Sequence, residues 1–455
     1  MRIEFEVPED ILHHLLDPVA IPRMARVRYE MVTPPPIDDI AAAVREQAQA
    51  AGAPALIKSG QRIAVGVGSR GIGRLPEIVA ALVAELRALG AEPFIVPTMG
   101  SHGGATAGGQ QEVLEHLGVT EGSVGAPILS SMETVEVGQT DEGTPVRVDR
   151  NAMGADGIVF VARVKPHTAF RGRYESGLAK MIAIGLGKQS GAALTHARGF
   201  GHMAEMVPKM AALALDKAPI LFGLGVLENA HDQPYKLVGV PAPRILSDEP
   251  ALLEEARRAM PRLPFDALDI LVIDEIGKNI SGDGADPNIT GRYPTPDASG
   301  GPQVNKQVVL DLTTATGGNA NGIGTADFTT VRAASKMSFG ATYPNALTST
   351  VPRPVALPMA LPSDRLAFAA ALLTCNAVER EPRLLRLKNT LSLGEFAVSE
   401  ALLDEVGTNP ALRIVADPAP VAFDPDGNLA DLAAAAPAPA PAPAPAPSGS
   451  LAASW

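Results

Sequence analysis

Short apolar runs alternate with amphipathic segments along much of the chain. RIAVGVG (62–68) and EPFIVPT (92–98) have the length and composition of buried strands. Between them, LPEIVAALVAELRALG (75–90) carries an apolar stripe at helical spacing. This order predicts a strand, a helix and a second strand of the same sheet.

The same pattern returns further along the chain. Buried strands are predicted for ADGIVFVARV (155–164), APILFGLGVL (218–227) and ALDILVIDEIG (267–277), and the last follows a predicted helix, PALLEEARRAM (250–260). Strands that alternate with helices are typical of α/β proteins with largely parallel sheets, which is the fold class we predict.

The length of 455 residues indicates two domains, because a single core seldom grows beyond ~250–300 residues. We place an N-terminal domain at 1–250 and a C-terminal α/β domain at 251–430. The Ala-Pro segment 431–455 is predicted to be a disordered tail, because it lacks the apolar residues of a core. The Gly-, Asn- and Asp-rich segment 283–321 is predicted to be a long loop.

Charge and composition exclude several kinds of protein. The net charge of -12 argues against binding to nucleic acid, which requires clustered Lys and Arg. One cysteine, Cys375, excludes a disulfide framework and is expected to be a buried thiol. The acidic start MRIEFEVPED differs from a secretion signal, and no apolar run is long enough for a membrane helix. We therefore expect a soluble cytoplasmic protein that binds no membrane.

Two glycine-rich motifs are ambiguous. GVGSRG (66–71) follows a strand and precedes a helix, as in NAD-binding folds, but the next strand ends in Pro97 and Thr98 instead of a ribose-binding acid. This helix start could hold an anion with Arg70. GLGKQSG (185–191) departs from the Walker A pattern, although its backbone amides could still cradle a phosphate.

Two histidines follow predicted strands. His102 lies in TMGSHGGAT and His167 in VKPHTAF. The carboxyl ends of parallel strands carry the binding sites of α/β proteins, so these histidines are candidate active-site residues. A lone histidine is more often structural, but the glycines around His102 allow a ligand to approach closely.

At these residues the sequence resembles the nickel-dependent lactate racemase family. The resemblance is carried by Arg70, His102, His167, Lys180 in GLAKM and His196 in LTHARG, which follow one another at intervals of 32, 65, 13 and 16 residues. It extends over most of the chain up to about residue 420, and family members have two α/β domains with the active site in the cleft between them.

The resemblance implies a nickel-pincer nucleotide, a modified pyridinium mononucleotide that holds nickel and is joined to a lysine. Lys180 would be the attachment point, and His196 would bind the nickel. His102 and His167 would be the acid/base pair, and Arg70 would bind the substrate carboxylate. Histidine titrates near neutral pH, imidazole is a suitable nickel ligand, and guanidinium can bind both carboxylate oxygens, so the residue types fit these roles.

The expected activity is that of an isomerase, a racemase or epimerase of a 2-hydroxy acid that works by reversible hydride transfer. Gly68 and Ser69 are expected to contact the cofactor, and Lys278 and Asn288 the substrate. Enzymes that make the cofactor are expected partners. The charged segment after His167 indicates a substrate other than lactate, such as malate or a sugar acid. The alternatives are an NAD-type oxidoreductase, or a fold relative that binds a metal or small anion without turnover.

The Ala-Pro tail yields the first prediction. A chain that ends at Asp431 should keep the melting temperature and activity of the full chain, because the tail has too little apolar surface to offset the entropy of ordering it. Thermal unfolding and an activity assay of both chains test this. A clear loss of either would show that the tail docks on the protein.

Overall fold

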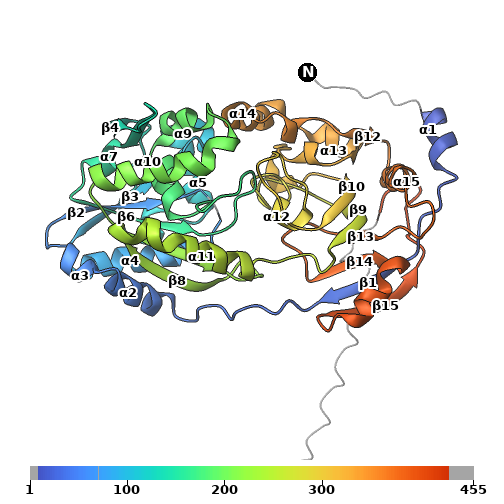
Figure 1. Cartoon of the computed structure of the whole chain (residues 1–455), viewed down its shortest axis with the longest axis horizontal. Helices are drawn as coiled ribbons and strands as arrows, with labels where there is room; N and C mark the ends of the chain where they lie inside the picture. The colour runs from blue at the N-terminus through green and yellow to red at the C-terminus, as the bar shows by residue number, and fades with distance from the viewer. Residues whose placement is uncertain (1–8, 70, 430–455) are drawn as a thin grey trace, which may run out of the picture.

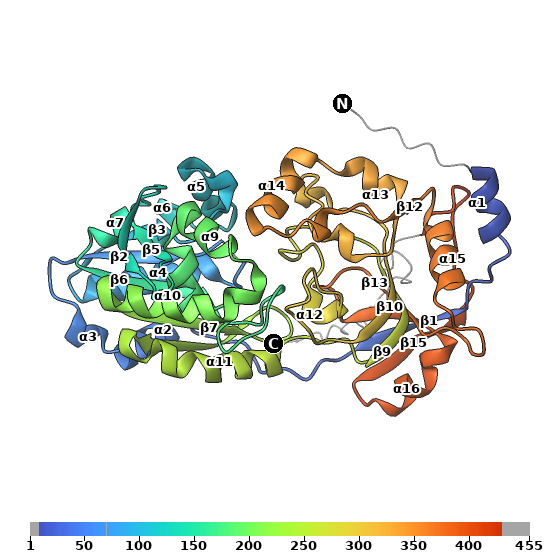
Figure 2. The ribbon, with the colours of Figure 1, turned by 45° about the horizontal axis from the view of Figure 1, so that its top comes forward.

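The computed structural model describes residues 9–69 and 71–429, and two large β-sheets organise this part of the chain. The five-stranded sheet lies in the blue-to-green half of the molecule and the eight-stranded sheet mainly in the yellow-to-red half (Figure 1). A separate ribbon is formed by β4 (Thr134–Gln139) and β5 (Pro145–Asp149). Figure 2 shows the two halves side by side, each with its own helices.

The five-stranded sheet has the order β3-β2-β6-β7-β8. Its first four strands are parallel, and β8 pairs antiparallel with β7 at the edge. The strands of this sheet have the bounds β2 Arg62–Val67, β3 Glu92–Pro97, β6 Gly157–Arg163, β7 Ile220–Glu228 and β8 Pro234–Pro241.

The eight-stranded sheet has the order β12-β11-β10-β9-β13-β14-β1-β15. The strands from β12 to β13 are parallel, and the other three pair antiparallel. Their bounds are β1 Met24–Tyr29, β9 Ala267–Ile273, β10 Gln303–Val309, β11 Phe328–Thr330, β12 Met359–Leu361, β13 Leu384–Leu387, β14 Glu395–Ser399 and β15 Leu412–Ala419.

The longer helices connect the strands and cover the sheets. They are α1 Glu9–Leu16, α2 Ile40–Ala50, α4 Leu75–Ala88, α5 Ala107–His116, α9 Lys188–His196, α10 Met203–Lys217, α11 Ile245–Ala259, α14 Phe339–Ser349 and α15 Asp364–Thr374. The shorter ones are α3 Ala53–Leu56, α6 Glu121–Val124, α7 Arg150–Met153, α8 Leu178–Lys180, α12 Pro287–Thr290, α13 Val331–Lys336 and α16 Leu403–Thr408.

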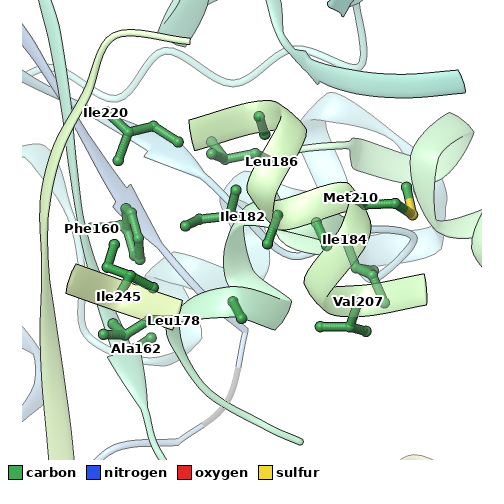
Figure 3. Packing of buried hydrophobic residues seen from close by; sticks show 14 of the residues in the cluster. Phe160, Ala162, Leu178, Ile182, Ile184, Leu186, Val207, Met210, Ile220 and Ile245 are labelled. Carbon is green, nitrogen blue, oxygen red and sulfur yellow. The ribbon is translucent and has the colours of Figure 1, made fainter. Parts of the chain in front are cut away.

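Both faces of the four parallel strands are buried, which is why these strands are almost continuously apolar. One face packs against α2 and α4. The other packs against α10, α11 and the segment that begins with α8, where Phe160 of β6 lies in one cluster with Leu178 and Ile182 (Figure 3). Each of these three side chains is completely buried, and such burial stabilises the fold by roughly 1.5–3 kcal/mol per side chain.

The structure confirms the α/β fold class and the predicted strands at β2, β3, β6, β7 and β9, as well as the helices α4 and α11. Cys375 is buried, as expected. The prediction of one long loop over 283–321 is wrong, because β10 lies within it. In β10 only the last three residues are buried, so its QVNKQVV sequence lacks the apolar run of a central strand.

The first strand of the chain joins the second sheet. β1 lies between β14 and β15, although the helices and strands that follow it build the first sheet. α11 packs against β7 and spans the predicted boundary at residue 250. The domain limits remain predictions, and the tail from 431 lies outside the described residues. Within the described ranges, no helix is both long and apolar enough to cross a membrane.

α11 also places a carboxylate at the start of α8. Glu249 is completely buried, and its Oε2 accepts the backbone N–H of Ala179 at 2.7 Å. The first N–H groups of a helix have no partner within the helix, so an acceptor there stabilises the helix start. A side chain at position 177 would collide with Oε1 of Glu249, so Gly177 allows this approach. Burial raises the pKa of Glu249 to about 7, against the lowering effect of the backbone N–H groups.

This carboxyl group should make stability depend on pH. Its folded-state pKa of about 7 exceeds the usual 4.5. Between these two pH values the folded protein keeps the proton, whereas the unfolded chain has released it. The free energy of unfolding should therefore fall by roughly 3 kcal/mol as the pH rises through this window. Glu249→Gln should remove that fall, as measured by urea unfolding at about pH 5 and about pH 8. Glu205→Gln, at an exposed position of α10, should keep it. If the free energy of unfolding changed equally with pH in Glu249→Gln and in the wild type, the raised pKa would not belong to Glu249.

Candidate active site

The turns after β2 and β3 meet at the carboxyl edge of the first sheet. Gly68 and Ser69 follow β2, and His102 lies in the turn after β3. The Oγ of Ser69 is hydrogen bonded to Nδ1 of His102, whose side chain is exposed. The structure thus brings together Ser69 and His102, which were expected to have different roles.

The turn after β6 holds His167, which is buried. Its Nδ1 accepts the backbone N–H of Ala169 at 3.0 Å, so in the neutral imidazole the proton is on Nε2. Nζ of Lys180 lies within hydrogen-bond distance of that Nε2. A protonated Nε2 can only donate, and Lys180 can accept from it only as an uncharged amine. An uncharged amine is the nucleophilic form of lysine.

A rare type of helix, the π-helix, directly follows Lys180 in the chain. Residues Met181–Gly185 form a π-helical turn, and such turns are frequent at functional sites. The turn packs under the strand ends, where a Cβ on Gly68 would lie 2.8 Å from Cε of Met181. The backbone N–H of Gly100 also donates to the carbonyl of Gly185 at 3.4 Å. Close packing therefore links Lys180 to the turns that hold Ser69 and His102.

Aromatic rings connect His167 with His196. The rings of His167 and Phe170 have centroids 4.5 Å apart, and Phe200 lies 6.1 Å from His167 and 5.6 Å from His196. Nζ of Lys180 lies 6.0 Å from the centre of the Phe170 ring. The structure therefore brings His167, Lys180 and His196 into one largely apolar cluster.

His196 is arranged to offer one ring nitrogen to a ligand. Its Nδ1 is 3.0 Å from the carbonyl oxygen of Thr348 and must donate to it, which leaves the lone pair on Nε2 in the neutral ring. Burial lowers the pKa of His196, against the raising effect of the Thr348 hydrogen bond. Metal-binding histidines commonly donate their second nitrogen to such a carbonyl. In the described part of the chain, no three His, Cys, Asp or Glu side chains gather as a metal site.

A buried carboxylate organises the His167 turn. Glu175 is completely buried, and it accepts the backbone N–H of His167 at 2.6 Å and that of Gly172 at 3.1 Å. It also forms ion pairs with Arg171, at 3.3 Å, and with Arg257 of α11. The sequence showed Glu175 only as one charge among several, because its partner Arg257 is 82 residues away.

A buried ion pair supports the His102 turn. Nζ of Lys188 lies 3.2 Å from Oδ2 of Asp149 and donates to Oε1 of Gln110 at 3.1 Å, and both charged side chains are fully buried. Gln110 in turn donates to the carbonyl oxygens of Gly100 and His102. Burial raises the pKa of Asp149 and lowers that of Lys188. The lysine of GLGKQSG therefore faces the protein interior, where it cannot bind a phosphate in solvent.

The His167 turn also contacts the loops of the second sheet. Arg171 donates to Oδ1 of Asn288 at 2.6 Å, to the hydroxyl of Tyr293 at 2.7 Å and to the carbonyl of Ser299 at 2.8 Å. Its guanidinium also donates to the carbonyl of His167. Asn288, expected to bind substrate, thus lies beside the His167 turn with its carbonyl oxygen bound to Arg171.

A second ion pair crosses between the two halves. Nζ of Lys165 lies 3.2 Å from Oδ2 of Asp286, and Oδ1 of Asp286 accepts from the side chain of Asn288 at 2.9 Å. Burial works against ionisation of Asp286, but Lys165 and Asn288 together hold its pKa below the usual value. The site therefore lies where the first sheet meets loops of the second.

Two other expected substrate contacts remain predictions. Nζ of Lys278 donates to the carbonyl of Gly282 at 2.9 Å and to Oδ1 of Asn345 at 2.8 Å, so these contacts hold it within the second half. Arg70 lies outside the described residues. Glu249, Asp149 and Gln110 were not predicted, because their roles depend on partners far away in the sequence.

Comparison with known proteins identifies the first half of the chain. Residues 6–206 match the lactate racemase N-terminal domain, and Arg70, His102, His167, Lys180 and His196 all fall within this range. No curated protein matches the chain. Among solved structures, the lactate racemase apoprotein from Thermoanaerobacterium thermosaccharolyticum is similar at 12% identity and a TM-score of 0.41, over 67% of this chain and 71% of that one. Residues 6–206 therefore form a lactate racemase N-terminal domain.

Proposed function

We propose that the protein is an isomerase that inverts the α-carbon of a 2-hydroxy acid with the help of a nickel-pincer nucleotide. The match of residues 6–206 to the lactate racemase N-terminal domain supports a racemase or epimerase activity in general. The observation that carries the more specific proposal is the grouping of His167, Lys180 and His196 around Phe170 and Phe200. A simple two-base racemase would need neither the lysine nor the third imidazole.

The residues present fit this cofactor. His196 can bind nickel through Nε2, because Nδ1 is engaged by Thr348. Lys180 is the attachment point, and its contact with Nε2 of His167 favours the uncharged amine that forms a covalent bond. Gly68 and Ser69 lie at the end of β2, before α4, where backbone N–H groups can face the nucleotide phosphate. When bound, the cofactor supplies a carbon atom that accepts the α-hydrogen with its bonding electrons and returns it.

The chain's own residues handle the hydroxyl proton. The bond between Nδ1 of His102 and Ser69 orients the exposed ring of His102, and Nε2 can take the proton when Nδ1 carries the hydrogen of that bond. His167 begins as an Nε2–H donor that can hold the substrate oxygen. For His167 to take a proton at Nε2, Nδ1 must release the N–H of Ala169. The two histidines therefore form an unequal acid/base pair.

Loss of the proton and of the α-hydrogen converts the 2-hydroxy acid into a 2-keto acid, whose carbonyl carbon is planar. Return of the hydrogen to the other face gives the opposite configuration. We propose that Arg70 and Lys278 hold the substrate carboxylate from the two halves of the molecule, because cations bind carboxylates strongly. The charged turn after His167 favours a substrate with a further polar group, such as malate or a sugar acid.

Cofactor attachment and nickel binding should depend on different residues. When the chain is produced together with the cofactor-synthesis enzymes, intact mass should show an adduct on Lys180, and metal analysis should show nickel. Lys180→Ala should lose both, whereas His196→Ala should keep the adduct and lose most of the nickel. His116→Ala, at an exposed position on α5, should keep both. An unmodified wild-type chain from that host would contradict the proposed cofactor.

The fate of the α-hydrogen tests the reaction itself. Lactate, malate and sugar acids would be screened as single enantiomers, and the acid that reacts would be turned over in D2O. The product should contain almost no deuterium at the α-carbon, because a hydrogen that is transferred with its electrons does not exchange with water. An α-deuterated substrate should keep its label and react more slowly. Extensive deuterium in the product would show proton transfer at carbon and overturn the proposed route.

A further inference from the structure

Next to the eight-stranded sheet lies a cavity, and none of the predicted site residues that the structure describes lines it. It has a volume of about 810 Å³ and opens at the N-terminal ends of β9 and β10. The loop 298–302 and the first residues of both strands form part of its wall. Small-molecule sites commonly have volumes of ~300–1,000 Å³, so a metabolite fits here. The cavity lies outside residues 6–206, which match the family.

Positive charge gathers around this cavity, although the chain as a whole has a net charge of -12. One aspartate, Asp269, lines the cavity together with four arginines, which are Arg292, Arg353, Arg380 and Arg383. Arginine presents a planar fork that binds phosphate or carboxylate oxygens in pairs. The lining therefore favours an anionic ligand.

Three of the arginines are held in place by acids. Arg380 donates to Asp269 at 2.7 Å, and Arg292 donates to Asp327 at 2.8 Å. Arg383 pairs with a carboxylate on α16 and donates to the carbonyl of the first residue of β9 at 2.9 Å. These contacts fix the guanidinium groups before a ligand arrives, which lowers the entropy cost of binding.

The fourth arginine leaves one charge unmatched. Among the residues that the structure describes, the guanidinium group of Arg353 makes no hydrogen bond or ion pair, and Arg353 is exposed. Pro352 and Pro354 flank it and restrict its backbone. Exposed Gly300 and Gly301 also line the cavity, and within the described ranges their backbone N–H groups donate to no protein atom. The four arginines outnumber their three carboxylate partners by one, and two backbone N–H groups are unused. Together these groups form a site for negatively charged oxygen atoms.

We propose that this cavity binds a small molecule with at least two oxyanion groups, either phosphates or carboxylates, and we name it the polyanion site. The ligand would engage Arg353 and the N–H groups of Gly300 and Gly301, and the other three arginines would surround it with positive charge. The proposal does not depend on the racemase activity.

The polyanion site shares residues with the contact that supports His167. Tyr293 and Ser299 line the cavity, and both accept hydrogen bonds from Arg171. A ligand in the cavity therefore restrains the loop to which Arg171 is hydrogen bonded. Through Arg171, the ligand should also restrain the turn that contains His167.

Calorimetry on the full chain tests binding. Tripolyphosphate and citrate would be titrated separately into the wild type, Arg353→Gln and Arg45→Gln. We expect binding of at least one probe to the wild type, and the probe that binds shows which anion the site prefers. Arg353→Gln should raise its Kd about tenfold or more, because a charge-assisted contact is lost. Arg45 is an exposed arginine on α2, and its variant should bind like the wild type. Absence of binding, or equal binding by Arg353→Gln, would overturn the proposal.

Hydrogen exchange measured by mass spectrometry locates the ligand. Addition of the binding probe should slow amide exchange in peptides that cover 291–305, and slower exchange should extend to 164–176 through Arg171. Arg353→Gln should show neither effect at the same probe concentration. Protection confined to other parts of the chain would place the ligand elsewhere and contradict the proposal. Protection of 291–305 alone would refute the link to His167.

Discussion

The buried carboxylate of Glu175 is the interaction on which the rest of the site depends. A charge without access to water requires partners, and Glu175 has two arginines and two backbone N–H groups. Arg257 ties it to α11, and Arg171 ties it to the loops of the second sheet. The backbone of His167 is held at the centre of this network. Removal of either arginine would leave a buried charge poorly compensated, so the two halves of the molecule and the His167 turn are stabilised together.

Other buried ionisable groups support the remaining parts of the site in a similar way. Glu249 binds the start of the helix that carries Lys180, and the Lys188–Asp149 pair holds Gln110 beneath the His102 turn. Each lies deep in the first half, where the dielectric constant is low and a missing partner is costly. Such supports keep the candidate catalytic groups in position before a ligand binds, and a preorganised active site requires this.

The parallel strands of the first sheet and the helices α4 and α11 could be predicted because both faces of these strands are buried. Their apolar runs and helical stripes follow directly from this burial. β10 could not be predicted, because polar residues fill its exposed first half. The pairing of β1 with β14 and β15 could not be predicted either, because the fold of the whole chain determines which strands pair.

The order and type of chemically useful residues were visible in the chain alone. His102 and His167 follow apolar strands, and Lys180 and His196 follow at spacings that pointed to the lactate racemase family. Only the tertiary structure decided how these groups face one another. The tautomer of His167 depends on a backbone N–H, and the free nitrogen of His196 depends on a carbonyl 152 residues away. The contacts between the halves depend on Arg171 and Lys165. Hydrogen bonds act over about 3 Å, and a linear pattern holds no information about which distant residues come within that range.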